Sequence, residues 1–291
     1  MYNILFEIIA PVFSCALIGF IWARSESKYD IDMVTDLVTK IGTPCLIFSI
    51  LVTVEIDEKH FFQVALASVV STLGFVITGY FCLKLIGLKA RVLLPATIFG
   101  NVGNMGLPLS LFAFGQEGLA LSIIYFTVNI IFLFTMGPAI TIGDISFKKI
   151  IRIPFLYSIA IAVLFINSDF PVPTWAIRTT KLLGDMMIPL MLITLGVSLA
   201  GLKQKNLTSS FLVSIIRLVG GFLVGCLTAE LLDLNSISKG IVIMQSTMPV
   251  AVFNYLIAQK YGSNSNDVAG AVIVSTALSF LTLPLLLDFI L

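Results

Sequence analysis

Charged residues are scarce in this chain of 291 residues: 33 side chains, or 11%, are Asp, Glu, Lys or Arg. Soluble globular proteins carry roughly a quarter, so the chain lacks the polar surface that water on all sides requires. The hydrophobic fraction of 58% and the mean hydropathy of +1.06 indicate that lipid is its main solvent. The 17 Lys and Arg against 16 Asp and Glu leave a net charge of +1, which excludes a nucleic-acid partner.

Histidine and cysteine are also rare. The one histidine, His60, ends a charged connector, so a metal centre or a Ser-His-Asp triad has almost no material. The four cysteines lie in apolar stretches without CxxC spacing, which excludes a disulfide framework. We therefore expect no bound metal, no cofactor and no enzymatic activity.

Long apolar runs dominate the sequence, and a helix that spans a bilayer needs about 20 such residues. Five runs carry no charged residue, and five more are shorter or contain an ionisable residue. The most economical interpretation is an all-α polytopic membrane protein with ten spans. The runs are 3–23, 32–54, 61–83, 92–116, 118–143, 153–168, 174–200, 208–232, 240–259 and 268–287.

Basic residues gather in connectors on one side of these ten segments. Positive connectors face the cytoplasm, so both termini are expected outside, and the protein is expected in the plasma membrane. Eleven of the 17 basic residues are on that side: Arg24, Lys28, Lys84, Lys89, Arg91, Lys148, Lys149, Arg152, Lys203, Lys205 and Lys260.

The polar connector 143–152 divides the chain into two sets of five segments, 1–150 and 151–291. An odd number of spans inverts the second half relative to the first. Inverted repeats with helices broken at matching places are typical of secondary transporters. Matching features are Gly42 with Gly184, Pro44 with Pro189, and Pro108 with Pro249.

The fourth segment contains GNVGNMGLP, a poor helix former. Its glycines weaken the helix, and Pro108 would free the carbonyl of residue 104, so we expect the helix to open near mid-membrane. Opened backbone in a bilayer must line a cavity or a protein interface. The residues that we expect at this break are Gly100, Gly103, Gly106, Asn101, Asn104 and Pro108.

The ninth segment repeats the pattern, with Pro249 four residues after Gln245. If the two opened segments cross, the N-termini of their half-helices direct partial positive charge toward one point, which suits a carboxylate. Asn and Gln amides would complete such a site without the desolvation cost of a buried Lys or Arg. The alternative is a pair of ordinary proline kinks without a ligand.

Three ionisable residues within the apolar segments are candidates for ion coupling or charge compensation. Asp185 lies eleven residues into its segment, about 16 Å from its end. It is either a proton site or a structural residue paired with a neighbour, for which Lys40 is one candidate. Lys40 can instead pair with Asp36 one turn earlier. Arg217 is either a charge-compensating residue for an anion or a side chain that snorkels or pairs structurally.

The segments GNVGNMGLPL and MPVAVFNYLIAQKYG resemble the two crossover helices of the auxin efflux carrier family. The resemblance extends over the whole chain. It implies the fold of bile-acid symporters and sodium/proton antiporters, with broken helices 4 and 9 crossed. It further implies a dimerising scaffold of spans 1, 2, 6 and 7, and a mobile domain of spans 3–5 and 8–10 that moves like an elevator.

The resemblance places the crossover prolines at Pro108 and Pro249, and the binding asparagine at Asn101 and Asn104. Gln245 and Asn254 complete the expected substrate-binding set. The sequence departs from the plant members of the family in two places: its central connector is short, and Asn254 stands where the plant members have a second proline. Both departures favour a small bacterial-type organic-acid carrier over an auxin carrier. The expected partners are a small organic acid, the bilayer and a second copy of the chain. Protons are favoured over sodium for coupling, and the alternatives are a membrane-embedded ligand sensor and a sodium-coupled symporter.

Overall fold

The computed structural model is helical throughout its described residues, which are 2–25, 28–55, 57–143, 153–168, 170–202, 206–260 and 265–291. The elements are α1 (Tyr2–Arg24), α2 (Ile31–Leu37), the π-helix η1 (Val38–Gly42), α3 (Thr43–Thr53), α4 (Glu58–Leu85), α5 (Ala90–Ile98), the π-helix η2 (Val102–Gly106), α6 (Leu107–Ile142), α8 (Pro154–Ile166), α9 (Thr174–Asp185), α10 (Met187–Gly201), α11 (Leu207–Leu231), α12 (Ser236–Ser246), α13 (Val252–Lys260) and α14 (Ser265–Ile290).

Polar residues at the ends of apolar runs determine where several helices begin. Asp30, Asp57, Asn206 and Asn235 each accept a backbone N–H from the first turn of α2, α4, α11 and α12, respectively. Such caps satisfy N–H groups that have no partner within the helix. α6 ends at Gly143, whose φ of 77° lies in the left-handed region that glycine adopts without strain.

Seven helices in the described part of the chain are long and apolar enough to cross a membrane, and α8 is a shorter apolar helix. Each of the ten runs expected from the sequence overlaps helical elements, and runs 92–116 and 240–259 are interrupted at 99–101 and 247–251. Runs 92–116 and 118–143 meet in α6 at Gly115, where a φ of 67° interrupts the helical path. The prediction of a polytopic all-α membrane protein is therefore confirmed.

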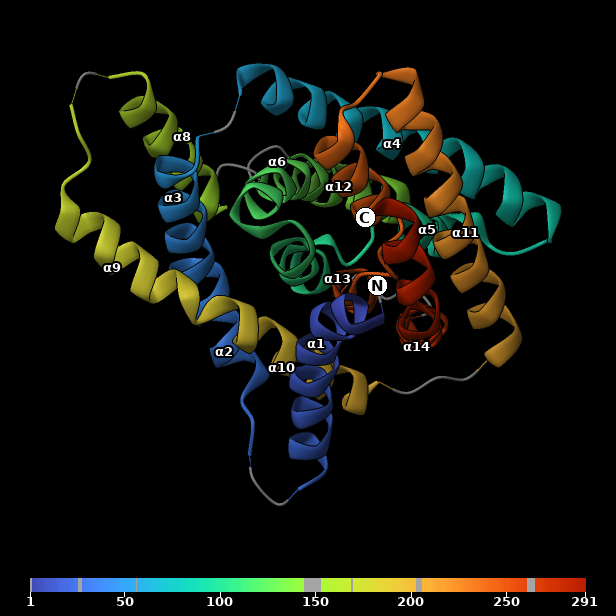
Figure 1. Ribbon diagram of the computed structural model, residues 1–291. Helices are drawn as coiled ribbons and strands as arrows, with labels where there is room; N and C mark the ends of the chain where they lie inside the picture. The colour runs from blue at the N-terminus through green and yellow to red at the C-terminus, as the bar shows by residue number, and fades with distance from the viewer. Residues whose placement is uncertain are drawn as a thin grey trace.

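The helices form two groups around a central set of short elements (Figure 1). α3 packs against α8 and α9 on one side, and α1 packs most extensively against α10. On the other side α11 contacts α4, α12 and α14. α12 and α13 lie near the centre of the view in Figure 1. The non-helical residues 99–101 and 247–251 are buried, so this backbone is enclosed by protein.

Glycine permits the close contact between α1 and α10. A Cβ on Gly19 would collide with the carbonyl of Ile193, and a Cβ on Gly196 would collide with the carbonyl of Ala16. Each helix therefore places a glycine against the backbone of the other, as small residues do in closely packed membrane helices. We call this reciprocal contact, made by Gly19 and Gly196, the α1–α10 glycine contact.

Several expectations lie outside the described residues. The basic residues Lys148, Lys149 and Arg152 of the central connector lie in 144–152, and Lys203 and Lys205 lie in 203–205; the structure describes neither range.

Candidate functional site

Two interrupted helices cross at the centre of the molecule. α5 stops at Ile98 and α12 stops at Ser246, and each is followed by a few non-helical residues. These two segments form an isolated antiparallel bridge between Gly100 and Val250. The N–H of Asn101 donates to the carbonyl of Pro249 at 2.7 Å, and the N–H of Ala251 donates to that of Phe99 at 3.1 Å. The crossover thereby satisfies backbone groups that both helices leave open.

The opening in the first half is not at Pro108, contrary to the sequence expectation. Pro108 lies in the first turn of α6, where proline is tolerated because its missing N–H would have no helical partner. The wide turn of η2 precedes it, and the chain leaves the helical path earlier, at Phe99–Asn101. Pro249, by contrast, lies within its break. The residues that meet at the crossover are Gly100 and Val250.

Arg217 of α11 binds the carbonyls at this crossover. Its side chain is 1% exposed and its guanidinium donates four hydrogen bonds, all to backbone oxygens. Nε donates to Met248 at 2.9 Å and Nη2 to Ser246 at 2.9 Å. Nη1 donates to Ile98 at 3.1 Å and to Thr97 at 3.3 Å. Arg217 is not among the residues that line the cavity described below.

Three of the predicted amides are buried around the crossover. Nδ2 of Asn254 donates to the carbonyl of Phe99 at 2.8 Å, and Nε2 of Gln245 donates to Oγ of Ser110 at 3.3 Å. Within the described part of the chain, Oδ1 of Asn254, Oε1 of Gln245 and Nδ2 of Asn101 have no hydrogen-bond partner. Buried amide atoms that lack a partner are costly, and such groups mark places for water or a ligand.

The predicted glycines allow close approaches at the same place. A Cβ on Gly106 would collide with the Gln245 amide, and a Cβ on Gly103 would lie 2.9 Å from Cε2 of Phe126. A Cβ on Gly100 would collide with the guanidinium of Arg217. The glycines at 100 and 106 therefore let side chains from other helices lie against the crossover backbone.

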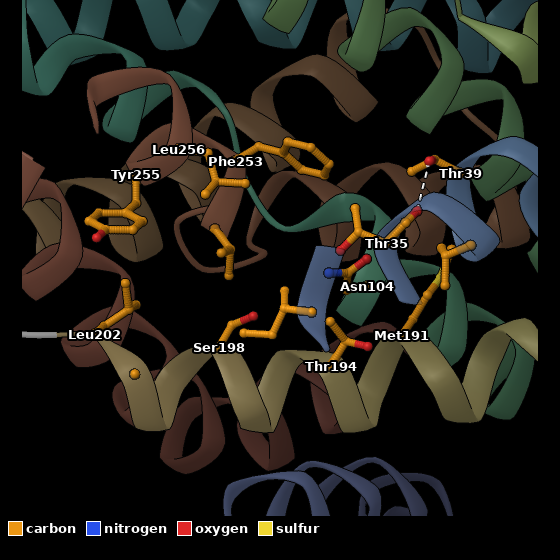
Figure 2. A pocket seen from close by; sticks show the side chains of 14 residues that line it. Thr35, Thr39, Asn104, Met191, Thr194, Ser198, Leu202, Phe253, Tyr255 and Leu256 are labelled. Atoms are coloured by element: carbon orange, nitrogen blue, oxygen red, sulfur yellow. Dashed lines mark hydrogen bonds between the residues drawn. The ribbon is translucent and has the colours of Figure 1, made fainter. Parts of the chain in front are cut away.

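A cavity of about 220 Å³ lies between the crossover and α2, η1 and α10. Figure 2 places Asn104, Thr35 and Thr194 toward one end, and Leu202, Tyr255 and Leu256 toward the other. Among the described residues, none of those that line it is charged. Its lining is Ile31, Thr35, Val38, Thr39, Asn104, Met191, Thr194, Ser198, Gly201, Leu202, Val252, Phe253, Tyr255 and Leu256.

Asn104 is the one predicted substrate-binding residue that the structure places on this cavity. The hydroxyls opposite it were not predicted: Thr35 and Thr39 come from α2 and η1, and Thr194 and Ser198 from α10. Each pair is spaced by four residues, which puts both hydroxyls on one helix face. Two hydroxyl residues four positions apart in an apolar run were therefore the sequence signal that could have predicted this wall of the cavity.

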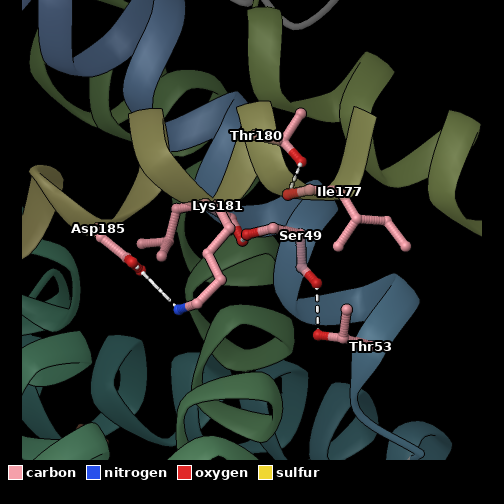
Figure 3. A network of polar contacts seen from close by, with 7 residues as sticks. Ser49, Thr53, Ile177, Thr180, Lys181 and Asp185 are labelled. Atoms are coloured by element: carbon pink, nitrogen blue, oxygen red, sulfur yellow. Dashed lines mark hydrogen bonds and ion pairs between the residues drawn. The ribbon is translucent and has the colours of Figure 1, made fainter. Parts of the chain in front are cut away.

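Asp185 and Lys40 do not meet. Asp185 accepts from Nζ of Lys181 at 3.1 Å, as Figure 3 shows, and Lys40 pairs with Asp36 at 2.6 Å. Both are i,i+4 pairs with side chains 58–62% exposed. The local alternative for Lys40 is confirmed. Asp185 is paired with a neighbour, as its structural alternative expects, but that neighbour is Lys181 and not Lys40.

The chain resembles known transport proteins. It matches the family model described as membrane transport protein over residues 4–142 and 138–287. It is 25% identical over 220 residues to an uncharacterized transporter of Methanocaldococcus jannaschii, with 71% of this chain and 70% of the relative covered. It is 24% identical over 294 residues to an uncharacterized transporter of Methanothermobacter thermautotrophicus, with 96% of each covered. The chain therefore belongs to the membrane transport protein family, that of the auxin efflux carriers, and is an integral membrane protein.

Proposed function

We propose that this protein carries small organic anions across the membrane and binds them in the cavity beside the crossover. The observation that carries this proposal is the position of the cavity against two helix N-termini. Asn104 belongs to η2, which continues directly into α6, and Val252 and Phe253 are the first residues of α13. Helix N-termini present free N–H groups and partial positive charge, so they attract anions.

Charge balance at the crossover supports an anionic substrate. The two interrupted helices have four ends there: α5 and α12 finish with negative ends, and η2–α6 and α13 begin with positive ends. Arg217 binds carbonyls at the negative ends. The positive ends each carry roughly half an elementary charge. One carboxylate would balance them both.

The lining favours a single carboxylate attached to an apolar body. Asn104 and the hydroxyl of Thr35 can supply hydrogen bonds at one end, whereas Leu202 and Leu256 line the other (Figure 2). The hydroxyl of Thr39 donates to the carbonyl of Thr35, and that of Thr194 pairs with the hydroxyl of Tyr29. A second carboxylate at the apolar end would lose its hydration without gaining a partner. We therefore favour monocarboxylates over dicarboxylates within the class of small organic anions.

We further propose ten spans in two inverted sets of five, with both termini outside, a scaffold-mediated dimer and elevator-like movement. The cavity suits this mechanism because one wall comes from α2, η1 and α10 and the other from the interrupted helices. Movement of one wall against the other would open the cavity alternately to each side. Protons remain the favoured coupling ion, with Asp185 as the candidate group.

Transport currents test the proposal. Purified protein in liposomes on a solid-supported membrane is challenged with mono- and dicarboxylates across a range of pH, and counterflow detects electroneutral exchange. Asn104→Ala should abolish the signal. Asn167→Ala is the matched control, because its exposed amide donates to the carbonyl of Val163 four residues earlier and does not line the cavity.

Signals for some acids that disappear in Asn104→Ala but persist in Asn167→Ala would support the site. Silence in both current and counterflow would favour a ligand sensor. An equal loss in both variants would move the site away from this cavity.

A further inference from the structure

Three of the four carbonyls that accept from Arg217 lie at the ends of interrupted helices, and the fourth lies in a break. Thr97 and Ile98 are the last two residues of α5, Ser246 is the last residue of α12, and Met248 follows it in the break. The final carbonyls of a helix have no partner within the helix. Arg217 is therefore the common cap of two half-helices that come from opposite halves of the sequence.

The charge on Arg217 matches what these two ends present. A helix C-terminus carries roughly half a negative elementary charge, so the ends of α5 and α12 together present about one. No ion pair joins Arg217 to a carboxylate within the described residues; its other close contact is the ring of Phe75, whose centroid lies 4.5 Å from Cζ. An arginine buried in this way needs another source of negative potential. The two helix ends provide it.

The surrounding residues are shaped to admit the guanidinium. Gly100 lacks the Cβ that would collide with it. Gly221, one helical turn after Arg217, lacks the Cβ that would collide with the carbonyl of Ser246. α11 thus approaches the end of α12 closely enough for the arginine to reach both breaks. Neighbouring hydroxyls extend the contact, because Oγ of Ser246 lies 3.1 Å from the hydroxyl of Tyr125.

We propose that Arg217 is a resident cation, a covalently attached substitute for a metal ion at the carbonyls of two crossed, interrupted helices. Unwound carbonyls and half-helix C-termini hold sodium in transporters of related design. Here the guanidinium already uses those carbonyls. Arg217 is thus a positioning residue: it joins the ends of α5 and α12 and leaves their N-terminal counterparts free for the substrate. Only the statement that these N-termini bind the substrate rests on the proposed function.

Chemical rescue tests the resident cation without a transport assay. In Arg217→Ala the carbonyl set remains and the guanidinium is missing. Millimolar guanidinium chloride, far below denaturing concentrations, should then raise the midpoint of thermal unfolding in detergent in a saturable way, relative to choline chloride at equal ionic strength. Sodium chloride should raise it to a smaller extent. The wild type should respond to neither cation beyond choline.

Arg24→Ala is the matched control. Arg24 also places Cζ 4.5 Å from an aromatic centroid, that of Phe20, but it is exposed at the end of α1. Rescue confined to Arg217→Ala supports the proposal. Absence of rescue by both cations, or equal rescue of Arg24→Ala, overturns it.

A second comparison covers the case in which Arg217→Ala does not fold. Arg217→Lys keeps the charge and some of the donors, whereas Arg217→Met keeps much of the volume without charge. The lysine variant should give more monodisperse protein and a higher unfolding midpoint. Equal losses in the two variants, or a more stable methionine variant, overturn the charge argument. These readouts need no substrate, so a silent transport assay with intact rescue would refute the anion carrier and not the resident cation.

Discussion

Gly100→Ala is the perturbation that examines the crossover most directly. The added Cβ would collide with Nη2 of Arg217 and would lie 2.9 Å from its Cζ and 3.0 Å from the carbonyl of Met248. Both groups are fixed by hydrogen bonds, so neither can move aside freely.

The expected loss of stability follows from two terms. Overpacking of a well-packed interior costs about 1–3 kcal/mol. If the guanidinium is displaced from one carbonyl, the loss of a hydrogen bond to a charged group adds roughly 1.5–3 kcal/mol. Together they give about 2.5–6 kcal/mol. At roughly 2 °C or more per kcal/mol, the unfolding midpoint should fall by about 5 °C or more.

Thermal unfolding followed by tryptophan fluorescence measures this change, and Gly220→Ala is its control. Gly220 lies in α11 with no atom within 4 Å of an added Cβ, so alanine there should leave the midpoint unchanged or raise it slightly. Arg217→Lys should weaken the effect of Gly100→Ala, because lysine lacks the colliding nitrogen. Equal midpoints for the two alanine variants, or strict additivity with the lysine substitution, would refute the geometry proposed for the crossover.

Three further predictions concern polar contacts elsewhere. Asn254→Ala should lower the unfolding midpoint by the equivalent of about 1–2 kcal/mol, because the carbonyl of Phe99 loses a side-chain donor. Asn235→Ala should lower the unfolding midpoint by the equivalent of about 1 kcal/mol, because Oδ1 of Asn235 accepts from the N–H of Ser238 and caps α12. Asp185→Asn should change stability by no more than about 0.5 kcal/mol, since its ion pair is exposed, but should flatten the pH dependence of transport if Asp185 carries the coupled proton.

A different result would contradict each of these three predictions. Asn167→Ala, which removes an exposed amide, should leave the midpoint unchanged, and an equal fall there would make the Asn254 effect nonspecific. An unchanged midpoint in Asn235→Ala would contradict the cap at the start of α12. Transport by Asp185→Asn with an unaltered pH profile would remove Asp185 from coupling.

The sequence predicted the helices well because apolar length and capping residues act locally. Each of the ten apolar runs overlaps helical elements. The glycine-rich stretch and Pro249 located the two breaks to within a few residues. These features depend on the chain's own backbone, so they can be derived without knowledge of tertiary packing.

The position of the first break could not be derived, because it depends on residues distant in sequence. Pro108 is accommodated at a helix start, and the chain instead opens where Gly100 admits Arg217 and pairs with Val250. The role of Arg217 was also open, since a buried arginine can bind a ligand, a carboxylate or, as here, free carbonyls. Only the fold specifies which of these lies within its reach.

The cavity was only partly predictable for a different reason. Asn104 belongs to a motif, whereas Thr194 and Ser198 are ordinary residues in an apolar helix. Threonine and serine in such helices usually bond to their own backbone. A functional assignment therefore required the opposite wall of the cavity, which folding brings together from the two halves of the chain.

The α1–α10 glycine contact has a consequence for measuring how the protein works. Gly196 lies between Thr194 and Ser198, so the hydroxyl wall of the cavity is on a helix whose backbone touches α1 directly. Such a contact leaves little room for sliding, and the two helices should behave as a fixed reference frame. In a spin-label experiment, distances between α1 and α10 should form one narrow distribution with and without substrate. Distances from α10 to α13 should then directly report the displacement of the opposite wall.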